Sequence, residues 1–407
     1  MALFLQQTLA VCLLLQALYI SSSWAFTTQT SQPFQLLASS SSTTSLQTTV
    51  AETSNNVKSQ YFDFQGHQCY SEVASPTFQA PLFGKKKPEV LLLHGFGCST
   101  VYWRETYRYL NEAGYTVHAV DLLGQGKSDK PGRADGIEYS TSLWAQVVDT
   151  YAKDYMKSAD EIVVVGNSLG SCVALAAATG DFPNDISSCS YSIAPRTIGI
   201  GMFNCGVGMN SRNVIRDPGW NPFQRALLTL LFDTLDFVIF GNRALISYLL
   251  NEVVTKELLQ NALTGLYRCA PDPESRVDDA LVESFYRPAQ DSGSVEALNQ
   301  IYTNDPGKTP MEFHEDNPQL SKLPIKLIWG DSDAVTPIAG SVGQFYTSLA
   351  NDENSKVSLQ MVNAGHIPFD EIPECNKFFV QWLDQLSENK GGSKKEPKPF
   401  FAWPFCQ

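Results

Sequence analysis

The stretch Ile162-Val163-Val164-Val165-Gly166-Asn167-Ser168-Leu169-Gly170-Ser171 decides how the rest of the chain is interpreted. Its four β-branched residues predict a strand buried on both faces, and the small residues 171–178 predict a helix packed closely on that strand. Ser168 then lies at a sharp strand-to-helix turn of the form G-x-S-x-G. The two glycines let neighbouring backbone approach where a Cβ atom would clash. We therefore expect the Ser168 hydroxyl at the end of the sheet, beside the N–H groups of a helix N-terminus.

A G-x-S-x-G motif alone is a weak indicator, because a purely structural turn after a buried strand has the same letters. A catalytic serine also needs a base, an acid that orients the base, and a second N–H donor for the oxyanion. The interpretation therefore depends on whether the chain supplies these groups in a matching order.

The residues before Ser168 predict alternating strands and helices. A buried strand, Glu89–Leu93, ends at His94-Gly95-Phe96-Gly97, and a second strand, 115–120, ends at Asp121. A helical pattern follows over 140–156, and an edge hairpin is predicted over 61–73. This order predicts an α/β fold with a mostly parallel, doubly wound sheet.

Two further strands after Ser168 end in chemically useful residues. The strand 325–329 is followed by Asp331 and Asp333, and the strand 357–362 is followed by His366. The order serine, aspartate, histidine, with each residue at the carboxyl end of its own strand, is that of an α/β-hydrolase triad. Asp331 is the alternative acid, and the spacing to Val335 and Pro337 favours Asp333.

Each predicted site residue has a distinct task. A serine hydroxyl is a poor nucleophile at neutral pH, so His366 has to accept its proton and later return it to the leaving alcohol. Asp333 holds the imidazole tautomer. The backbone N–H groups of Phe96 and Leu169 are predicted to bind the oxyanion. The remaining motifs predict no cofactor and no metal, and His67, His118 and His314 are interpreted as surface or core residues.

An insertion is expected between the two halves of the sheet. After a predicted strand at 190–194 no strand is evident from Arg196 to Gly293, and several helical runs are. We interpret residues 196–293 as a helical lid. Its apolar residues, such as Trp220 and Phe223, indicate a hydrophobic substrate, although an ordinary lid core explains any one of them equally well. Asp233 and Asp236 interrupt its most apolar run, which argues against a transmembrane span.

Composition excludes several classes of function. The chain has 407 residues, a formal net charge of −13 and a pI near 4.9, which argues against nucleic acid as a partner. Its nine cysteines are scattered without a C-x-x-C pair. This pattern indicates buried free thiols in a reducing compartment rather than a zinc site or a disulfide framework.

The two ends of the chain differ from its centre. Residues 1–25 have the apolar run and small residues of a signal peptide, and residues 26–57 form a hydroxyl-rich, acid-poor segment that begins with Phe26. Together they resemble the bipartite plastid presequence of algae with secondary plastids, which implies a plastid location. The alternative is secretion with a Ser/Thr-rich stalk. Residues 389–407 are predicted to be a flexible tail, whose aromatic end contacts a thylakoid membrane, docks on the protein's own surface or stays loose.

The predicted organisation is then a hydrolase-type core in two parts, 58–195 and 294–388, with the lid at 196–293 between them. Residues 88–387 resemble the alpha/beta-hydrolase superfamily, and within it the plastid and cyanobacterial branch that includes pheophytinase and chlorophyll dephytylase. The matching stretches are His94-Gly95-Phe96-Gly97, Asp121–Gly126, Gly166–Gly170 and Ala364-Gly365-His366.

The resemblance implies hydrolysis of a carboxylic ester, with the phytol ester of pheophytin or chlorophyll as one substrate and other plastid lipids as alternatives. Epoxide hydrolases and haloalkane dehalogenases of this fold use an aspartate at the elbow, where this chain has Ser168. Lipase, thioesterase or acyltransferase activity through the same acyl-enzyme remains open, as does a receptor that binds a small ligand without turnover. The oligomeric state is also open.

Overall fold

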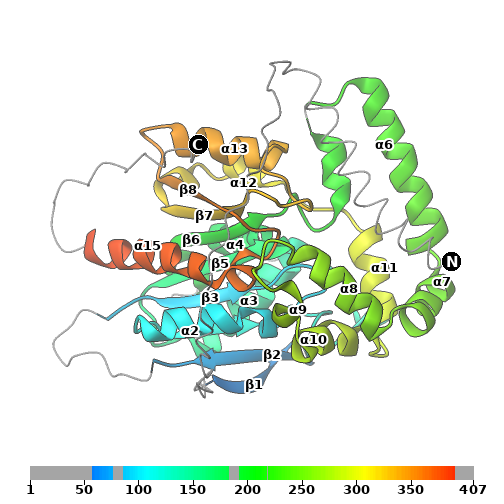
Figure 1. Cartoon of the computed structure of the whole chain (residues 1–407), viewed down its shortest axis with the longest axis horizontal. Coiled ribbons are helices and arrows are strands. Elements are labelled where there is room, and N and C mark those ends of the chain that lie inside the picture. The colour runs from blue at the N-terminus through cyan, green and yellow to red at the C-terminus, as the bar shows by residue number, and fades with distance from the viewer. Residues whose placement is uncertain (1–56, 77–85, 183–191, 218, 390–407) are drawn as a thin grey trace, which may run out of the picture.

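A central eight-stranded sheet organises the protein (Figure 1). The computed structural model describes residues 57–76, 86–182, 192–217 and 219–389. The strand order is β1-β2-β4-β3-β5-β6-β7-β8; the neighbouring pairs from β4 to β8 are parallel, and β1 and β2 form an antiparallel hairpin at one edge. The strands are β1 Val57–Phe64, β2 His67–Ala74, β3 Glu89–Leu93, β4 Val117–Val120, β5 Ile162–Ser168, β6 Thr197–Cys205, β7 Ile325–Gly330 and β8 Val357–Val362.

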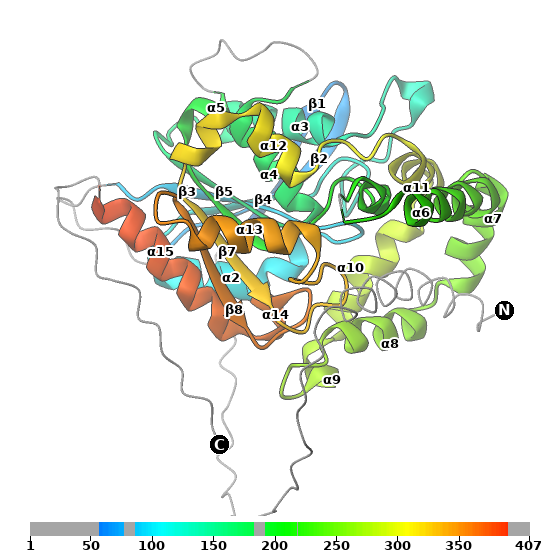
Figure 2. The same ribbon diagram turned by 90° about the horizontal axis from the view of Figure 1, so that it is seen from above.

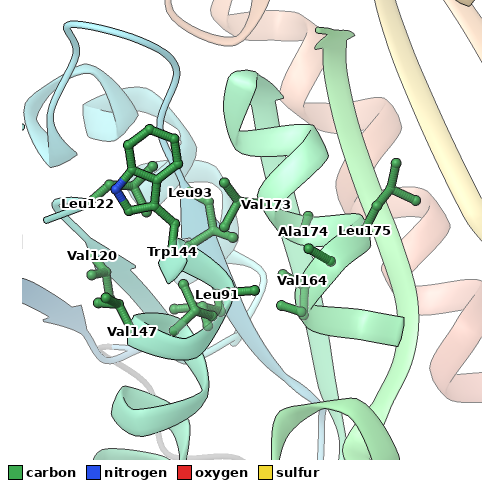
Figure 3. Close-up of a cluster of buried hydrophobic side chains, with 14 of the residues drawn as sticks. Leu91, Leu93, Val120, Leu122, Trp144, Val147, Val164, Val173, Ala174 and Leu175 are labelled. Carbon is green, nitrogen blue, oxygen red and sulfur yellow. The ribbon is translucent and has the colours of Figure 1, made fainter. Parts of the chain in front are cut away.

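The central strands are buried on both faces, as their uninterrupted apolar sequences require. Along β3, Leu91 and Leu93 enter one hydrophobic cluster, whereas Val90 and Leu92 enter another on the opposite face. The first cluster also includes Trp144 and is drawn in Figure 3. Because successive side chains of a strand point to opposite faces, one five-residue strand contributes to both cores.

Helices cover both faces of the sheet (Figure 2). On one side lie α3 (Thr141–Tyr155) and α4 (Leu169–Thr179), which pack on each other and form part of the first cluster. On the other side lie α2 (Arg104–Glu112) and α15 (Asn376–Asn389). The predicted α/β class, with a mostly parallel doubly wound sheet, is therefore confirmed, as are the edge hairpin, the strands at 89–93, 325–329 and 357–362, and the helix at 140–156.

One part of the sequence-based assignment is wrong. Residues 190–194 were predicted to form a strand, but Ile193–Arg196 form the short helix α5 and Ser192 is in no strand. Residues 190 and 191 lie outside the described ranges. The strand is instead β6, Thr197–Cys205, inside the stretch where no strand was expected. Its glycines hide the strand pattern. A Cβ atom on Gly201 would lie 2.6 Å from the ring of Phe379, so the glycine makes room for α15.

Helices dominate the chain between β6 and β7, as expected for the insertion. They gather beyond one end of the sheet, on the right of Figure 1. The α-helices of this group are α6 Pro222–Leu235, α7 Arg243–Tyr248, α8 Lys256–Leu266, α9 Pro273–Arg276, α10 Asp279–Ala289 and α11 Ser294–Thr303. The last α-helix before β7, α12 (Pro310–Asp316), contacts α4 and α13 (Ser341–Asn351) instead. Among the described residues, no helix combines the length and the apolar character that crossing a bilayer requires.

The predicted signal peptide (1–25) lies outside the described residues, as do the transit-like segment (26–57) except for Val57 and the tail (389–407) except for Asn389. Their assignments stay predictions.

Candidate active site

Ser168 occupies a strained backbone turn between β5 and α4. Its φ is +53° and its ψ is −122°, a conformation that non-glycine residues rarely adopt. The turn is held by tight backbone contacts. A Cβ atom on Gly170 would lie 2.2 Å from the carbonyl oxygen of Leu93, and one on Gly166 would lie 2.2 Å from the backbone of Gly170. The glycines of the motif therefore permit β3, β5 and α4 to meet behind Ser168.

This contact predicts a large effect of Gly170→Ala on stability. The added methyl group has to displace the backbone of β3, so we expect the free energy of unfolding to fall by about 3 kcal/mol. The matched control is Gly265→Ala in α8, where an added Cβ atom meets nothing within 4 Å. That variant should be neutral or stabilised by up to about 1 kcal/mol. Urea denaturation of both proteins tests this, and equal midpoints would contradict the close-contact explanation.

The loop that carries Phe96 is fixed against the Ser168 turn. The N–H group of Gly95 donates to the Tyr102 hydroxyl at 2.6 Å, and that hydroxyl donates to Oδ1 of Asn167 at 3.2 Å. The N–H group of Gly97 donates to Oε1 of Gln125 at 2.7 Å. These bonds hold the backbone on both sides of Phe96. Leu169 is the first residue of α4, so its N–H group has no acceptor within the helix.

His366 and Asp333 form a buried hydrogen-bonded pair. Nδ1 of His366 donates to Oδ2 of Asp333 at 2.8 Å, and the side chains are 10% and 0% exposed. Asp331, the alternative acid, is exposed and its Oδ1 accepts from the hydroxyl of Ser332. The His366 loop also contacts the serine turn, because Nδ2 of Asn167 donates to the carbonyl oxygen of His366 at 3.2 Å. The structure thus places Asp333 beside the histidine and joins the histidine loop to the residue before Ser168.

The Asp333 carboxylate accepts four further hydrogen bonds. Its Oδ1 accepts from the N–H groups of Val335 and Thr336, at 2.7 and 3.1 Å. Its Oδ2 accepts from the Thr336 hydroxyl at 2.7 Å and from Nδ2 of Asn204 at 2.6 Å. Asn204 is fully buried near the end of β6 and has a φ of +47°, so the backbone is held in an unusual conformation where its amide reaches the acid.

These partners change the titration of Asp333. Burial alone would raise its pKa, but the charge of His366 and the hydrogen bonds from His366, Asn204 and Thr336 outweigh burial and lower the pKa to about 2. Asp333 is thus predicted to remain ionised throughout the neutral and mildly acidic range.

The lowered pKa predicts an acid-dependent loss of stability. An acid whose pKa is lower in the folded than in the unfolded chain stabilises the fold above its unfolded pKa, near 4, and loses that contribution as the pH falls toward 2. We expect the loss to reach about 2 kcal/mol. Urea denaturation between about pH 5 and about pH 2 should show the stability gap between wild type and Asp333→Asn narrowing on acidification. A difference in the free energy of unfolding between the two proteins that stays constant over this pH range would contradict the prediction.

A cavity of about 270 Å³ opens beside Ser168. Ser168, Phe96 and Leu169 line it from the sheet side, and Leu228 and Phe232 of α6 with Tyr302 of α11 line it from the helical insertion. The Tyr302 ring packs edge-on against Phe96, with ring centroids 5.4 Å apart. The predicted nucleophile and both predicted oxyanion donors therefore share one largely apolar cavity with the insertion.

Sequence reasoning missed three residues of this site: Asn204, Thr336 and Tyr302. Thr336 lies three residues after Asp333, so its hydroxyl could have been noticed as a local partner. Asn204 carried no such signal because β6 was not recognised, and Tyr302 lies outside the predicted lid. The other histidines have structural environments: His118, for example, is buried and hydrogen-bonded to Glu89 and Tyr151.

Comparisons with known proteins concern the family and the fold of the chain. Residues 90–379 match the profile of a family described as the alpha/beta hydrolase family. An uncharacterized protein of Mycobacterium tuberculosis is 25% identical over 316 residues, which cover 74% of this chain and 79% of that protein. A carboxylesterase of Bacillus subtilis is 41% identical over 88 residues, covering 21% of this chain and 34% of the esterase. Among solved structures, potato epoxide hydrolase I superposes with a TM-score of 0.55 at 16% identity, covering 81% of this chain and all of that one.

Proposed function

Since the chain belongs to the alpha/beta hydrolase family, we propose that it is a serine hydrolase that cleaves a carboxylic ester of a hydrophobic substrate. The observation that carries the proposal is the cavity that Ser168 shares with Phe96 and Leu169, together with the buried hydrogen bond between His366 and Asp333. The local similarity to a carboxylesterase supports the same reaction type. The serine at the turn argues against the aspartate-dependent reactions of other proteins with this fold.

In this proposal Ser168 attacks the ester carbonyl carbon while His366 accepts the hydroxyl proton. The bond from Oγ to the carbonyl carbon forms, and the oxyanion is bound by the N–H groups of Phe96 and Leu169, each worth about 3 kcal/mol of barrier. The bond to the alcohol then breaks, and the proton on His366 passes to the departing oxygen. Water repeats the sequence on the acyl-enzyme and releases the acid. Asp333 keeps the imidazole in the tautomer that accepts the serine proton.

The cavity favours an apolar chain of the substrate. Its lining from α6 and from Trp329 is apolar, and its volume is near the lower end of the range of about 300–1,000 Å³ typical of ligand pockets. We propose that it holds one hydrocarbon chain of the ester, on either the acyl or the alcohol side. The phytol ester of pheophytin or chlorophyll is one substrate of this chemistry, and other plastid lipids are alternatives. A plastid location, inferred from residues 1–57, is part of this narrower proposal.

The test is steady turnover by the purified protein with a matched set of substrates. Short and long nitrophenyl esters report ester hydrolysis, pheophytin a and chlorophyll a report release of phytol, and an acyl thioester reports thiol release. We expect many turnovers of the long nitrophenyl ester, with a kcat/KM higher than that of the short ester. Phytol release would establish the pigment substrate, and its absence beside active nitrophenyl hydrolysis would exclude it. Saturable binding of these compounds without turnover would overturn the enzyme proposal in favour of a receptor.

A further inference from the structure

The helix α6 and the π-helical turn η5 (Asp236–Phe240) that continues it carry an exposed apolar stripe. Its five members and their exposed fractions are Phe223 (77%), Leu227 (57%), Leu230 (64%), Phe237 (85%) and Val238 (47%). Eleven large hydrophobic side chains are exposed among the described residues, so nearly half of them fall within these 16 positions. Exposed apolar residues scattered singly need no explanation, but a cluster of this kind marks an interaction surface.

The stripe is on the opposite side of α6 from the cavity. At about 3.6 residues per turn, Phe223, Leu227 and Leu230 share one face of the helix, whereas Leu228 and Phe232 lie on the other and line the cavity beside Ser168. The helix is therefore apolar on both sides, and it separates the candidate active site from the surface that carries the stripe. It lies at the margin of the molecule, at the opposite end from α15 (Figure 1).

The charges of this segment are neutralised locally. Its two carboxylates, Asp233 and Asp236, both pair with Arg212, the former at 2.6 Å. Arg225 of α6 supplies the second positive charge, so these four side chains sum to zero. Both carboxylates of α6 and η5 are thus ion-paired, although the whole chain carries a net charge of −13. An apolar, locally neutral face on an acidic protein is suited to uncharged or zwitterionic lipid and poorly suited to an anionic membrane, which would repel the rest of the protein.

We propose that the stripe docks on the surface of a zwitterionic lipid bilayer, with α6 lying in the plane of the interface. An amphipathic helix binds a membrane by inserting one apolar face among the headgroups, and a single stripe suffices for this. A second copy of the chain is a poorer fit, because a stable dimer uses about 20–30 residues on each side. Docking in this position brings the cavity next to the membrane, with α6 between them. The docking itself does not require the proposed hydrolase activity.

The test is flotation of the full chain with phosphatidylcholine vesicles. The triple variant Phe223→Ser/Leu230→Ser/Phe237→Ser removes the three most exposed side chains of the stripe and none that lines the cavity. Its matched control is Tyr61→Ser/Met361→Ser/Phe378→Ser, which removes three exposed hydrophobic side chains from β1, β8 and α15. We expect the stripe variant to lose at least tenfold in partition coefficient and the control to bind like the wild type. Replacing part of the phosphatidylcholine with phosphatidylglycerol should weaken wild-type binding.

Several outcomes would overturn the proposal. Equal partition of wild type and stripe variant, whether strong or absent, would show that α6 is not the docking element. A dimer in size-exclusion chromatography that the stripe variant alone loses would assign the face to a second copy. Turnover of a dissolved short ester and thermal unfolding report whether the stripe variant is intact. If it is not, the single substitution Phe237→Ser, at the most exposed position, should still lower the partition coefficient about threefold, and no change would overturn the proposal equally.

Discussion

Ser168→Ala is expected to lower kcat for ester hydrolysis by about 10⁴-fold or more, with KM nearly unchanged. The substitution removes the only atom that can form the acyl-enzyme in the proposed mechanism, while the cavity that binds the substrate keeps its apolar lining. The measurement is the steady-state hydrolysis of a long nitrophenyl ester. An organophosphonate probe gives an independent readout, because it should add its mass to the wild type and not to the variant.

Ser171→Ala is the matched control for this experiment. Ser171 lies three residues after Ser168, in α4, and is fully buried. Its hydroxyl donates to the carbonyl oxygen of Gly166 at 3.0 Å. Its loss should cost about 1 kcal/mol of stability and change kcat only a few-fold. If the two alanine variants lost activity equally, the effect would come from disturbing the turn. If Ser168→Ala kept wild-type turnover, the nucleophile assignment would be wrong.

Asp333→Asn is expected to lower kcat by about 10⁴-fold. Oδ2 of Asp333 accepts from His366, Thr336 and Asn204 at once. An asparagine can satisfy these donors only with its carbonyl oxygen, it has no charge to stabilise the imidazolium, and its amide group then faces the backbone donors at Oδ1. If the side chain instead turns its carbonyl oxygen toward the N–H groups of Val335 and Thr336, its amide group faces Nδ1 of His366 and favours the wrong imidazole tautomer. The kcat of the purified variant, followed with the same ester, tests this prediction.

Asp331→Asn is the control that separates the two candidate acids. Its side chain is exposed and contacts the hydroxyl of its neighbour Ser332 rather than His366. We expect its kcat to stay within about twofold of the wild type, as is usual for a surface substitution away from the site. The opposite ranking, with Asp331→Asn inactive and Asp333→Asn active, would assign the acid role to Asp331 and contradict the present assignment.

The helical insertion was recognised in the sequence, but its limits were not. A short, uninterrupted apolar run followed by glycine-containing turns correctly predicted β3 and β5. The same signal fails for β6, where glycines accommodate the aromatic side chains of α15, a helix almost 180 residues further along the chain. The packing of α15 on β6 therefore explains why this strand contains glycines, and those glycines are the reason that the sequence pattern did not predict a strand there. The side chains of α6 that line the cavity could not be identified from the sequence for a related reason, since this helix is apolar on both sides.

What the sequence by itself determined is the class of fold and the placement of the candidate catalytic residues Ser168, Asp333 and His366 at the carboxyl ends of β5, β7 and β8. These features depend on local order, because a short run of β-branched residues specifies a buried strand and the residues after it lie at its end. The tertiary structure alone decided which carboxylate faces His366, that Asn204 donates to it from 129 residues away, and that α6 has one face in the cavity and one exposed. These contacts depend on how segments that are distant in the sequence pack together, and the local sequence pattern does not specify that packing.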